Sequence, residues 1–283
     1  GVDVDLVQIS TEGDRNADAV TDFGGQGVFI AALRDALISG DIDIAVHSLK
    51  DLPTTPDPRL VIAAMPARVD ARDCLVARDG LTLGELPQGA RIGTGSTRRE
   101  AQLNALGLGV EVVPVRGNVD TRVGKVASGE YDGVIVARAG LLRLGRADEA
   151  TEVIDPLQML PAPGQGALAC ECRADDDATI RLLDGLDDID TRVAVTAERS
   201  LLATLEAGCS APVGALAEVA SGDDGDELWL RAMVGDRSGS PTIRLSATGL
   251  PSEAAAVGER LAAEMLAEGA DTLVSLASST PGR

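Results

Sequence analysis

The sequence predicts an α/β protein made of two α/β domains, joined by a double hinge, and a small C-terminal α+β domain. Strand-like and helix-like segments alternate over the first two thirds of the 283 residues, a pattern typical of sheets that are covered by helices. Two proline-containing segments interrupt this alternation. The last third instead holds three strand-like runs between two long helix-like segments.

The first α/β domain is expected to comprise residues 1–66 and 167–186. Alternation of apolar and polar residues favours strands, whereas apolar residues spaced by three and four favour a helix. The predicted elements are, in chain order, a strand over Asp3–Ser10, a helix over Gly27–Ser39, and strands over Ile42–His47, Leu60–Ala64 and Ala167–Arg173.

The second α/β domain is expected over residues 72–160, inserted into the first. Its predicted strands are Asp73–Ala77, Arg91–Gly93, Glu111–Arg116 and Asp132–Ala137, and its predicted helices are Thr97–Ala105 and Val119–Ser128. The crossings between the two domains are Met65–Arg72 and Leu160–Gly166, the second with the sequence Leu-Pro-Ala-Pro-Gly-Gln-Gly. Folds of this class bind ligands in loops at the carboxyl ends of strands, so we expect a site in these loops.

The third domain is expected over residues 189–283 as an antiparallel meander with helices. Turns rich in Gly, Asp and Ser separate its strand-like runs, which favours hairpin connections. Its predicted elements are helices over Thr191–Glu206 and Ser252–Glu268 and strands over Val213–Val219, Glu227–Gly235 and Thr242–Ala247.

The composition excludes several classes of protein. A formal net charge of −20 repels nucleic acid and anionic membranes, and 1% aromatic residues leaves little for base stacking. No run of about 18 apolar residues and no secretory signal is visible, so we expect a cytoplasmic protein whose cysteines are free thiols. His47 is the only histidine, which excludes a two-histidine zinc motif, and we expect no metal.

Positive charge is concentrated in the middle of the chain. Residues 72–160 hold 11 basic and 12 acidic residues, so their net charge is −1, against −20 for the whole chain. Its arginines lie at the ends of predicted elements, at Arg98, Arg99, Arg116, Arg122, Arg138, Arg143 and Arg146. Clustered guanidinium groups at strand ends favour a pocket for carboxylates or phosphates. Surface ion pairing would explain the same residues.

Two loops of this region are typical of anion sites. The segment from Ile92 to Arg99 has a strand that leads through small residues into a helix, where free backbone N–H groups and the hydroxyls of Thr94 and Ser96 favour an anion. Arg116-Gly-Asn-Val-Asp-Thr-Arg122 repeats this design, with Asn118 as the helix cap. An ordinary helix cap is the alternative for each.

Two further segments carry reactive side chains. The apolar strand before His47 delivers Ser48, Lys50 and Asp51 to its carboxyl end, where Asp51 could stabilise a cation or transfer a proton. An exposed turn before a proline is the alternative. Cys209 follows a predicted helix end among small residues, so its thiol is either an accessible nucleophile or a structural cysteine.

Together, seven motifs in series resemble the porphobilinogen deaminase family. They are Gly24-Gly-Gln-Gly-Val-Phe29, His47-Ser-Leu-Lys-Asp51, Gly93-Thr-Gly-Ser-Thr-Arg-Arg99, Arg116-Gly-Asn-Val-Asp-Thr-Arg122, Ala139-Gly-Leu-Leu-Arg-Leu-Gly145, Leu160-Pro-Ala-Pro-Gly-Gln-Gly166 and Gly208-Cys-Ser-Ala-Pro212. The resemblance covers almost the whole chain in order. It implies that the first two domains resemble a periplasmic binding protein with a hinged cleft.

The resemblance also implies a transferase that condenses four porphobilinogens head to tail into hydroxymethylbilane, with loss of ammonia. Its primer is a dipyrromethane joined by a thioether to the cysteine that matches Cys209, and the matching catalytic carboxylate is Asp51. The matching cofactor contacts are Ser48, Lys50, Thr94, Ser96, Arg98, Arg99, Arg116, Gly117 and Arg122, and the matching substrate contacts are Phe29, Arg143 and Gln165.

The family begins with a strand and a Thr-Arg-x-Ser segment that this sequence does not contain, which predicts a first domain without that strand. From the resemblance and the acidic surface we expect a monomer that binds porphobilinogen and neither nucleic acid nor membrane. Two other hypotheses stay open at this point. One is a non-catalytic hinged module that binds anions, and the other is an inactive, truncated deaminase.

Overall fold

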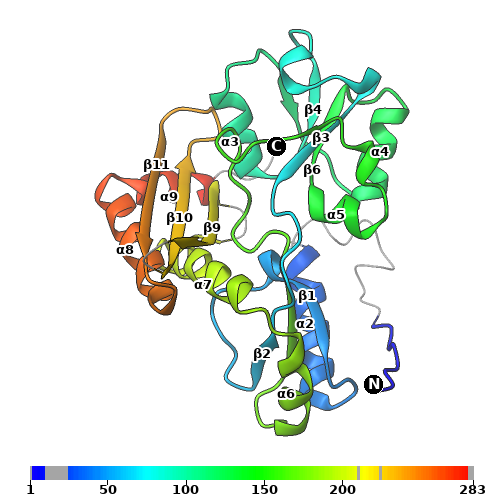
Figure 1. The fold of residues 1–283 in the computed structure, drawn as a ribbon. Helices are drawn as coiled ribbons and strands as arrows, with labels where there is room; N and C mark the ends of the chain where they lie inside the picture. The colour runs from blue at the N-terminus through cyan, green and yellow to red at the C-terminus, as the bar shows by residue number, and fades with distance from the viewer. Residues whose placement is uncertain (1, 10–24, 209–210, 223–224, 280–283) are drawn as a thin grey trace.

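The computed structural model describes residues 2–9, 25–208, 211–222 and 225–279, and it contains three separate β-sheets. Figure 1 shows one sheet at the lower end of the molecule, a second at the upper right and a third at the left. Helices cover each sheet. The expectation of a mixed α/β protein with a small C-terminal antiparallel sheet is therefore confirmed.

The lower sheet lies between two helices. Its strands are β1 (Ala45–Ser48), β2 (Leu60–Ala64) and β8 (Leu168–Arg173), in the order β1-β8-β2, and its helices are α2 (Gly25–Ser39) and α6 (Asp177–Leu183). Both outer strands run antiparallel to β8. The pleat sends alternate residues to opposite faces, so Ala45 packs toward α2 while Cys170 and Cys172 pack on the side of α6.

The upper sheet has five strands and mixed direction. They are β3 (Asp73–Ala77), β4 (Arg91–Gly93), β5 (Glu111–Val113), β6 (Gly133–Ala137) and β7 (Glu152–Val153), in the order β5-β4-β6-β3-β7. Its helices are α3 (Thr97–Ala105), α4 (Val119–Ala127) and α5 (Arg138–Arg143). Buried residues of α3 join the core on one face of the sheet, and those of α4 and α5 join the core on the other. The parallel pair β4 and β6 aims the loops before α3 and α5 at one edge.

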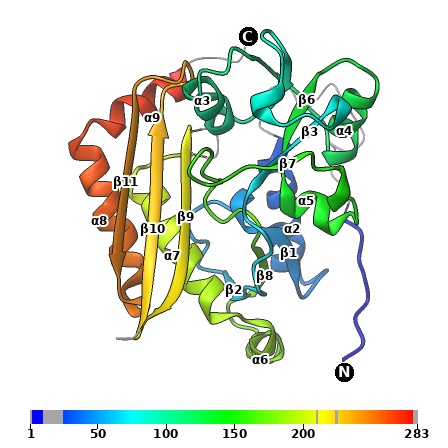
Figure 2. The same ribbon diagram turned by 45° about the horizontal axis from the view of Figure 1, so that its top comes forward.

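The third sheet is an antiparallel meander. Its strands are β9 (Val213–Gly222), β10 (Gly225–Gly235) and β11 (Thr242–Gly249), and its helices are α7 (Ile189–Thr204), α8 (Ala254–Ala267) and α9 (Ala270–Ser279). Figure 2 shows the three helices on one face of the sheet, and side chains of all three enter its core. The strand β9 forms the edge that faces the rest of the molecule.

The chain crosses between the lower and upper sheets twice, once between β2 and β3 and once between β7 and β8. We call residues 65–72 and 154–167 the crossing segments. They touch each other, because the N–H of Val69 donates to the carbonyl of Gly166 at 3.3 Å. Gly166 has a φ of +87°, and a Cβ there would lie 2.6 Å from the carbonyl oxygen of Val69. The position therefore requires glycine.

One predicted strand is wrong. Residues 2–9 form no regular secondary structure, and Ser10 lies outside the described residues. Leu6 is 97% exposed and Val4 is 71% exposed. Apolar alternation predicts a strand only where a neighbouring strand offers backbone partners and a core covers one face. The described residues offer this segment no strand partner, and of its apolar residues only Ile9 packs against a core.

Candidate active site

The site begins with a rigid turn at the carboxyl end of β1. Leu49, Lys50 and Asp51 form a short 3-10 helix in which Leu49 is fully buried. From α7, the guanidinium of Arg199 donates to the carbonyls of Leu52 at 3.0 Å and Pro53 at 2.6 Å. The buried Leu49 and the guanidinium of Arg199 thus fix the turn. Lys50 and Asp51 lie half-buried at its surface.

Asp51 lines a pocket of about 250 Å³ between β1 and α2. The other walls come from the polar His47 and Ser48 and from Phe29, Ile30, Leu33 and Val46. Phe29 is 40% exposed, so its ring is open to a ligand in the pocket. Burial raises the pKa of Asp51, and the charges of Lys50 and His47 oppose that shift. The pocket therefore combines one carboxyl group with an aromatic ring and an apolar wall.

A buried cationic cluster lies on the upper side of the site, at the start of α3. The side chain of Ser96 caps this helix and accepts from the N–H of Arg99 at 3.4 Å. The first turn carries Arg98 and Arg99, which are 3% and 5% exposed. Both guanidinium groups contact the fully buried Asp73, at 2.9 Å from Arg98 and 2.7 Å from Arg99. Burial would raise the pKa of Asp73, but these two cations outweigh it and hold that pKa far below its usual range.

Gln165 joins the cationic cluster to the turn of Asp51. Its amide nitrogen donates to Asp73 at 2.8 Å and to the carbonyl of Ala71 at 2.7 Å. Its amide oxygen accepts from Lys50 at 3.4 Å. Burial lowers the pKa of Lys50 to about 8, and nearby Arg99 acts in the same direction. Gln165 thus links the cationic cluster at the start of α3 to Lys50, the residue next to Asp51.

The cluster keeps two donors without partners. Among the described residues, neither the Nε of Arg98 nor the Nε of Arg99 has a hydrogen-bond acceptor, although both atoms are buried. Leaving a buried donor unpaired costs about 1–3 kcal/mol, so such groups call for an explanation. The Arg122 guanidinium shares this space, because burial and the charge of Arg99 both lower its pKa. A ligand with carboxylate groups would satisfy these donors.

Other predicted site residues lie around this centre. Thr94 is buried and its hydroxyl accepts from the N–H of Ser96 at 3.1 Å. Gly117 has a φ of +105°, and its carbonyl accepts from the Nε of Arg122 at 2.8 Å. Arg116 is exposed beside it. Arg143 donates to the carbonyl of Gly166 at 2.9 Å. Cys209 lies outside the described residues.

Sequence reasoning missed Asp73 as part of the site. It appeared only as the first residue of a predicted apolar strand. The signal was present, however, because an acidic residue inside a run that becomes fully buried needs a cationic partner. The two adjacent arginines of α3 supply that partner.

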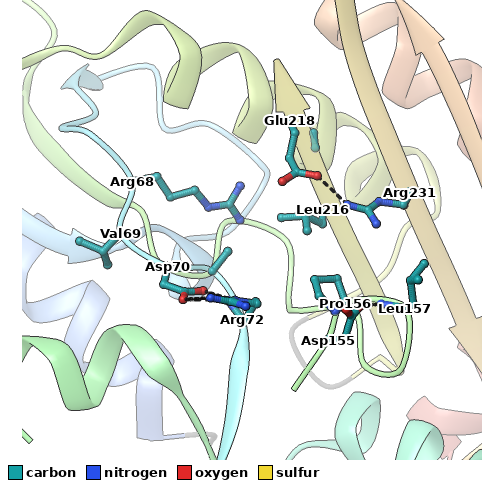
Figure 3. Close-up of a pocket in the computed structure, with 12 residues that line it drawn as sticks. Arg68, Val69, Asp70, Arg72, Asp155, Pro156, Leu157, Leu216, Glu218 and Arg231 are labelled. Atoms are coloured by element: carbon teal, nitrogen blue, oxygen red, sulfur yellow. Dashed lines mark hydrogen bonds and ion pairs between the residues drawn. The ribbon is translucent and has the colours of Figure 1, made fainter. Parts of the chain in front are cut away.

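A larger pocket, of about 620 Å³, lies between the crossing segments and the third sheet. Figure 3 shows two ion pairs among its charged side chains, with Asp70 bound to Arg72 and Glu218 bound to Arg231. These pairs satisfy much of each other's charge. The smaller pocket holds Asp51, whose neighbour Lys50 is linked through Gln165 to the cationic cluster, and is the better candidate for chemistry.

The described residues hold no group of three or more His, Cys, Asp or Glu side chains that could bind a metal ion. No helix among them is long and apolar enough to cross a membrane.

Comparison with known proteins places these features in context. Residues 1–181 match the family model for the porphobilinogen deaminase dipyrromethane cofactor binding domain, and residues 192–267 match the model for its C-terminal domain. A porphobilinogen deaminase of Mycolicibacterium gilvum is 59% identical over 279 residues, which cover 97% of this chain and 89% of that protein. One of Nocardia farcinica is 57% identical over 288 residues, covering 100% and 83%.

Solved structures give a looser likeness. The VFT2 domain of Bordetella pertussis BvgS overlaps 60% of this chain and 72% of its own, with 17% identity and a TM-score of 0.36.

Proposed function

The chain belongs to the porphobilinogen deaminase family, and from that premise we propose that Asp51 is its catalytic carboxylate and that Cys209 carries its dipyrromethane. The enzyme condenses four porphobilinogen molecules head to tail into hydroxymethylbilane and releases one ammonia for each. When bound, the dipyrromethane would supply the pyrrole end that serves as primer, and Cys209 would hold it. The single observation that carries the proposal is the half-buried Asp51 pocket, whose neighbouring Lys50 is linked through Gln165 to a cationic cluster with unpaired donors.

Asp51 acts on the substrate through its negative charge. Porphobilinogen becomes cationic as ammonia leaves, and a carboxylate at this place stabilises positive charge that develops on the pyrrole. Burial raises the pKa of Asp51, so the group can also exchange a proton closer to neutral pH than an ordinary carboxyl group. Phe29 offers a flat apolar surface for a pyrrole ring on the opposite wall of the pocket.

The cationic cluster binds the carboxylates of the dipyrromethane and of the substrate. Acetate and propionate groups need donors that are already fixed, and Asp73 and Gln165 hold the arginines before any ligand arrives. For the cofactor we propose contacts from Ser48, Lys50, Thr94, Ser96, Arg98, Arg99, Arg116, Gly117 and Arg122. For the substrate we propose contacts from Phe29, Arg143 and Gln165.

The attachment at Cys209 is tested by the intact mass of freshly purified protein. We expect the mass of the wild type to exceed that of the bare chain by one dipyrromethane, and Cys209→Ala to show the unmodified mass. Cys170→Ala is the matched control, because Cys170 is a free buried cysteine of β8. An unmodified wild type, or an adduct that persists in Cys209→Ala, would contradict the proposal.

We also infer a monomeric cytoplasmic enzyme that does not bind nucleic acid. The net charge of −20 disfavours polyanions and self-association. Cys74, Cys170 and Cys172 are free thiols, as in reducing compartments. Light scattering after size exclusion tests the first point, and a mass of twice 29.0 kDa would contradict it.

A further inference from the structure

The only histidine of the chain is buried next to the proposed catalytic carboxylate, and the proposed chemistry does not use it. His47 is the third residue of β1 and is 5% exposed. The register pairs His47 with Ala169 and Ala45 with Glu171, so His47 and Glu171 are diagonal neighbours on one face of the sheet. His47 Nε2 lies 3.2 Å from Glu171 Oε2.

A third residue fixes this pair from the helix above. Arg34 of α2 binds both oxygens of Glu171, with Nε at 3.1 Å and Nη2 at 2.8 Å. Glu171 is 2% exposed. Burial alone would raise its pKa, but the bonds from His47 and Arg34 outweigh burial and lower that pKa. A buried carboxylate that an arginine binds at both oxygens is a rigid anchor, because breaking that pair leaves a buried charge unpaired.

These contacts join two walls of the Asp51 pocket, although only His47 of the three residues lines it. His47 lines the pocket beside Ser48 and Asp51. One helical turn before Arg34, Ile30 lines it from α2, and so does its neighbour Phe29. The Arg34–Glu171–His47 chain therefore connects the helix that carries the aromatic wall to the strand that carries the carboxyl group.

We propose that His47 is a positioning residue, which Glu171 and Arg34 hold against the Asp51 pocket so that its imidazole ring, in its protonated form, acts electrostatically on the Asp51 carboxylate. This inference rests on the proposed role of Asp51. The charged groups around His47 are Glu171 of β8 at 3.2 Å, Arg34 of α2 bound to that carboxylate, and Lys50 and Asp51 in the turn after β1. Of these, only Asp51 is open to the pocket and bears the proposed chemistry.

The proposal predicts the direction of a measurable change. The charge of His47 lowers the pKa of Asp51, against the larger effect of burial. A neutral side chain at position 47 removes that opposition, so the pKa of Asp51 rises further. As the pH falls, the Asp51 carboxylate is then protonated at a higher pH than in the wild type. The acid limb of kcat/KM therefore moves to higher pH.

The experiment titrates Asp51 directly by ¹³C NMR of the full chain labelled at its aspartate carboxyl carbons. Its resonance is assigned by its absence in Asp51→Asn. In His47→Gln we expect the titration midpoint to rise by about half a pH unit or more. The acid limb of kcat/KM for porphobilinogen consumption should move by the same amount, which is about a three-fold loss on that limb.

Arg34→Lys is the second variant, in case His47→Gln does not fold. It keeps His47 and Glu171 but replaces the bidentate guanidinium with a single ammonium group. We expect the Asp51 midpoint to rise in the same direction by a smaller amount. Arg59→Lys is its matched control, because Arg59 binds both oxygens of the exposed-loop residue Asp57 and should leave the titration unchanged.

An unchanged Asp51 midpoint in both His47→Gln and Arg34→Lys would overturn the proposal, even if both variants melt at lower temperature. The NMR readout does not depend on turnover. If His47→Gln raises the Asp51 midpoint but the wild-type protein consumes no porphobilinogen, the link between His47 and Asp51 is supported. The proposed function of Asp51 is then contradicted.

Discussion

Replacing Glu198 by Gln should destabilise the junction of the three sheets. Glu198 of α7 is fully buried and accepts four hydrogen bonds. Two come from Arg68 at 2.7 and 3.1 Å, one from the N–H of Gly164 at 2.6 Å, and one from the N–H of Ala217 at 2.8 Å. These donors belong to both crossing segments and to β9, so one carboxylate holds three separate segments together.

The magnitude follows from the loss of a buried charge. Glutamine keeps the volume of Glu198, but it directs an NH₂ group at donors and leaves the Arg68 guanidinium, which is 11% exposed, without its counter-charge. Breaking one side of a buried ion pair costs about 3–5 kcal/mol. At about 2–4 °C per kcal/mol for a chain of roughly this size, the melting temperature should fall by about 10 °C.

Thermal unfolding followed by far-ultraviolet circular dichroism measures this change. Glu218→Gln is the matched control, because Glu218 binds Arg231 on the surface with 59% of its side chain exposed. Exposed pairs contribute about 0–1 kcal/mol, so that variant should melt within a few degrees of the wild type. Equal melting temperatures for the two variants would refute the idea that Glu198 stabilises the junction.

Three other outcomes are expected. Gly166→Ala should cost at least about 1 kcal/mol more than Gly40→Ala in urea unfolding, because both positions have positive φ but only Gly166 brings a Cβ against the carbonyl of Val69; equal costs would contradict this. Lys50 loses its charge as pH rises through about 8, so KM for porphobilinogen should rise there, and a rise that persists unchanged in Lys50→Arg would exclude Lys50 as its cause. Because burial raises the pKa of Asp51, turnover should fall with decreasing pH well before the ordinary carboxyl range near 4; a fall confined to that range would contradict the assignment.

Local sequence rules predicted the helices and strands whose ends are marked by residues that disfavour their continuation. Leu60–Ala64 and Asp73–Ala77 were predicted to the residue, because apolar runs there lie between prolines, glycines and charges. The end of α3 was likewise correct. Asp3–Ser10 has the same local pattern, yet Leu6 is 97% exposed, because a strand also requires a partner that its own residues do not specify.

The site was predictable where its parts lie close together in sequence. The strand exit before Arg98 indicated anion binding, and the one before Lys50 indicated a carboxylate that acts on a cation or a proton. The structure connects the two through Gln165, which binds Lys50 and Asp73, the partner of Arg98. The role of Asp73 as their buried counter-charge could not be inferred, because it depends on packing between strands and helix. The contact between His47 and Glu171 depends on the register of two distant strands, which periodicity alone does not fix.

The proposed chemistry depends most directly on Asp51. Consumption of porphobilinogen by wild type and Asp51→Asn, both with the same dipyrromethane content by mass, tests its role. We expect the variant to keep the melting temperature of the wild type and to lose about 100-fold or more in kcat/KM, since a positioned acid–base group contributes at least that much. Wild-type turnover by Asp51→Asn would contradict the assignment of the chemistry to this carboxylate.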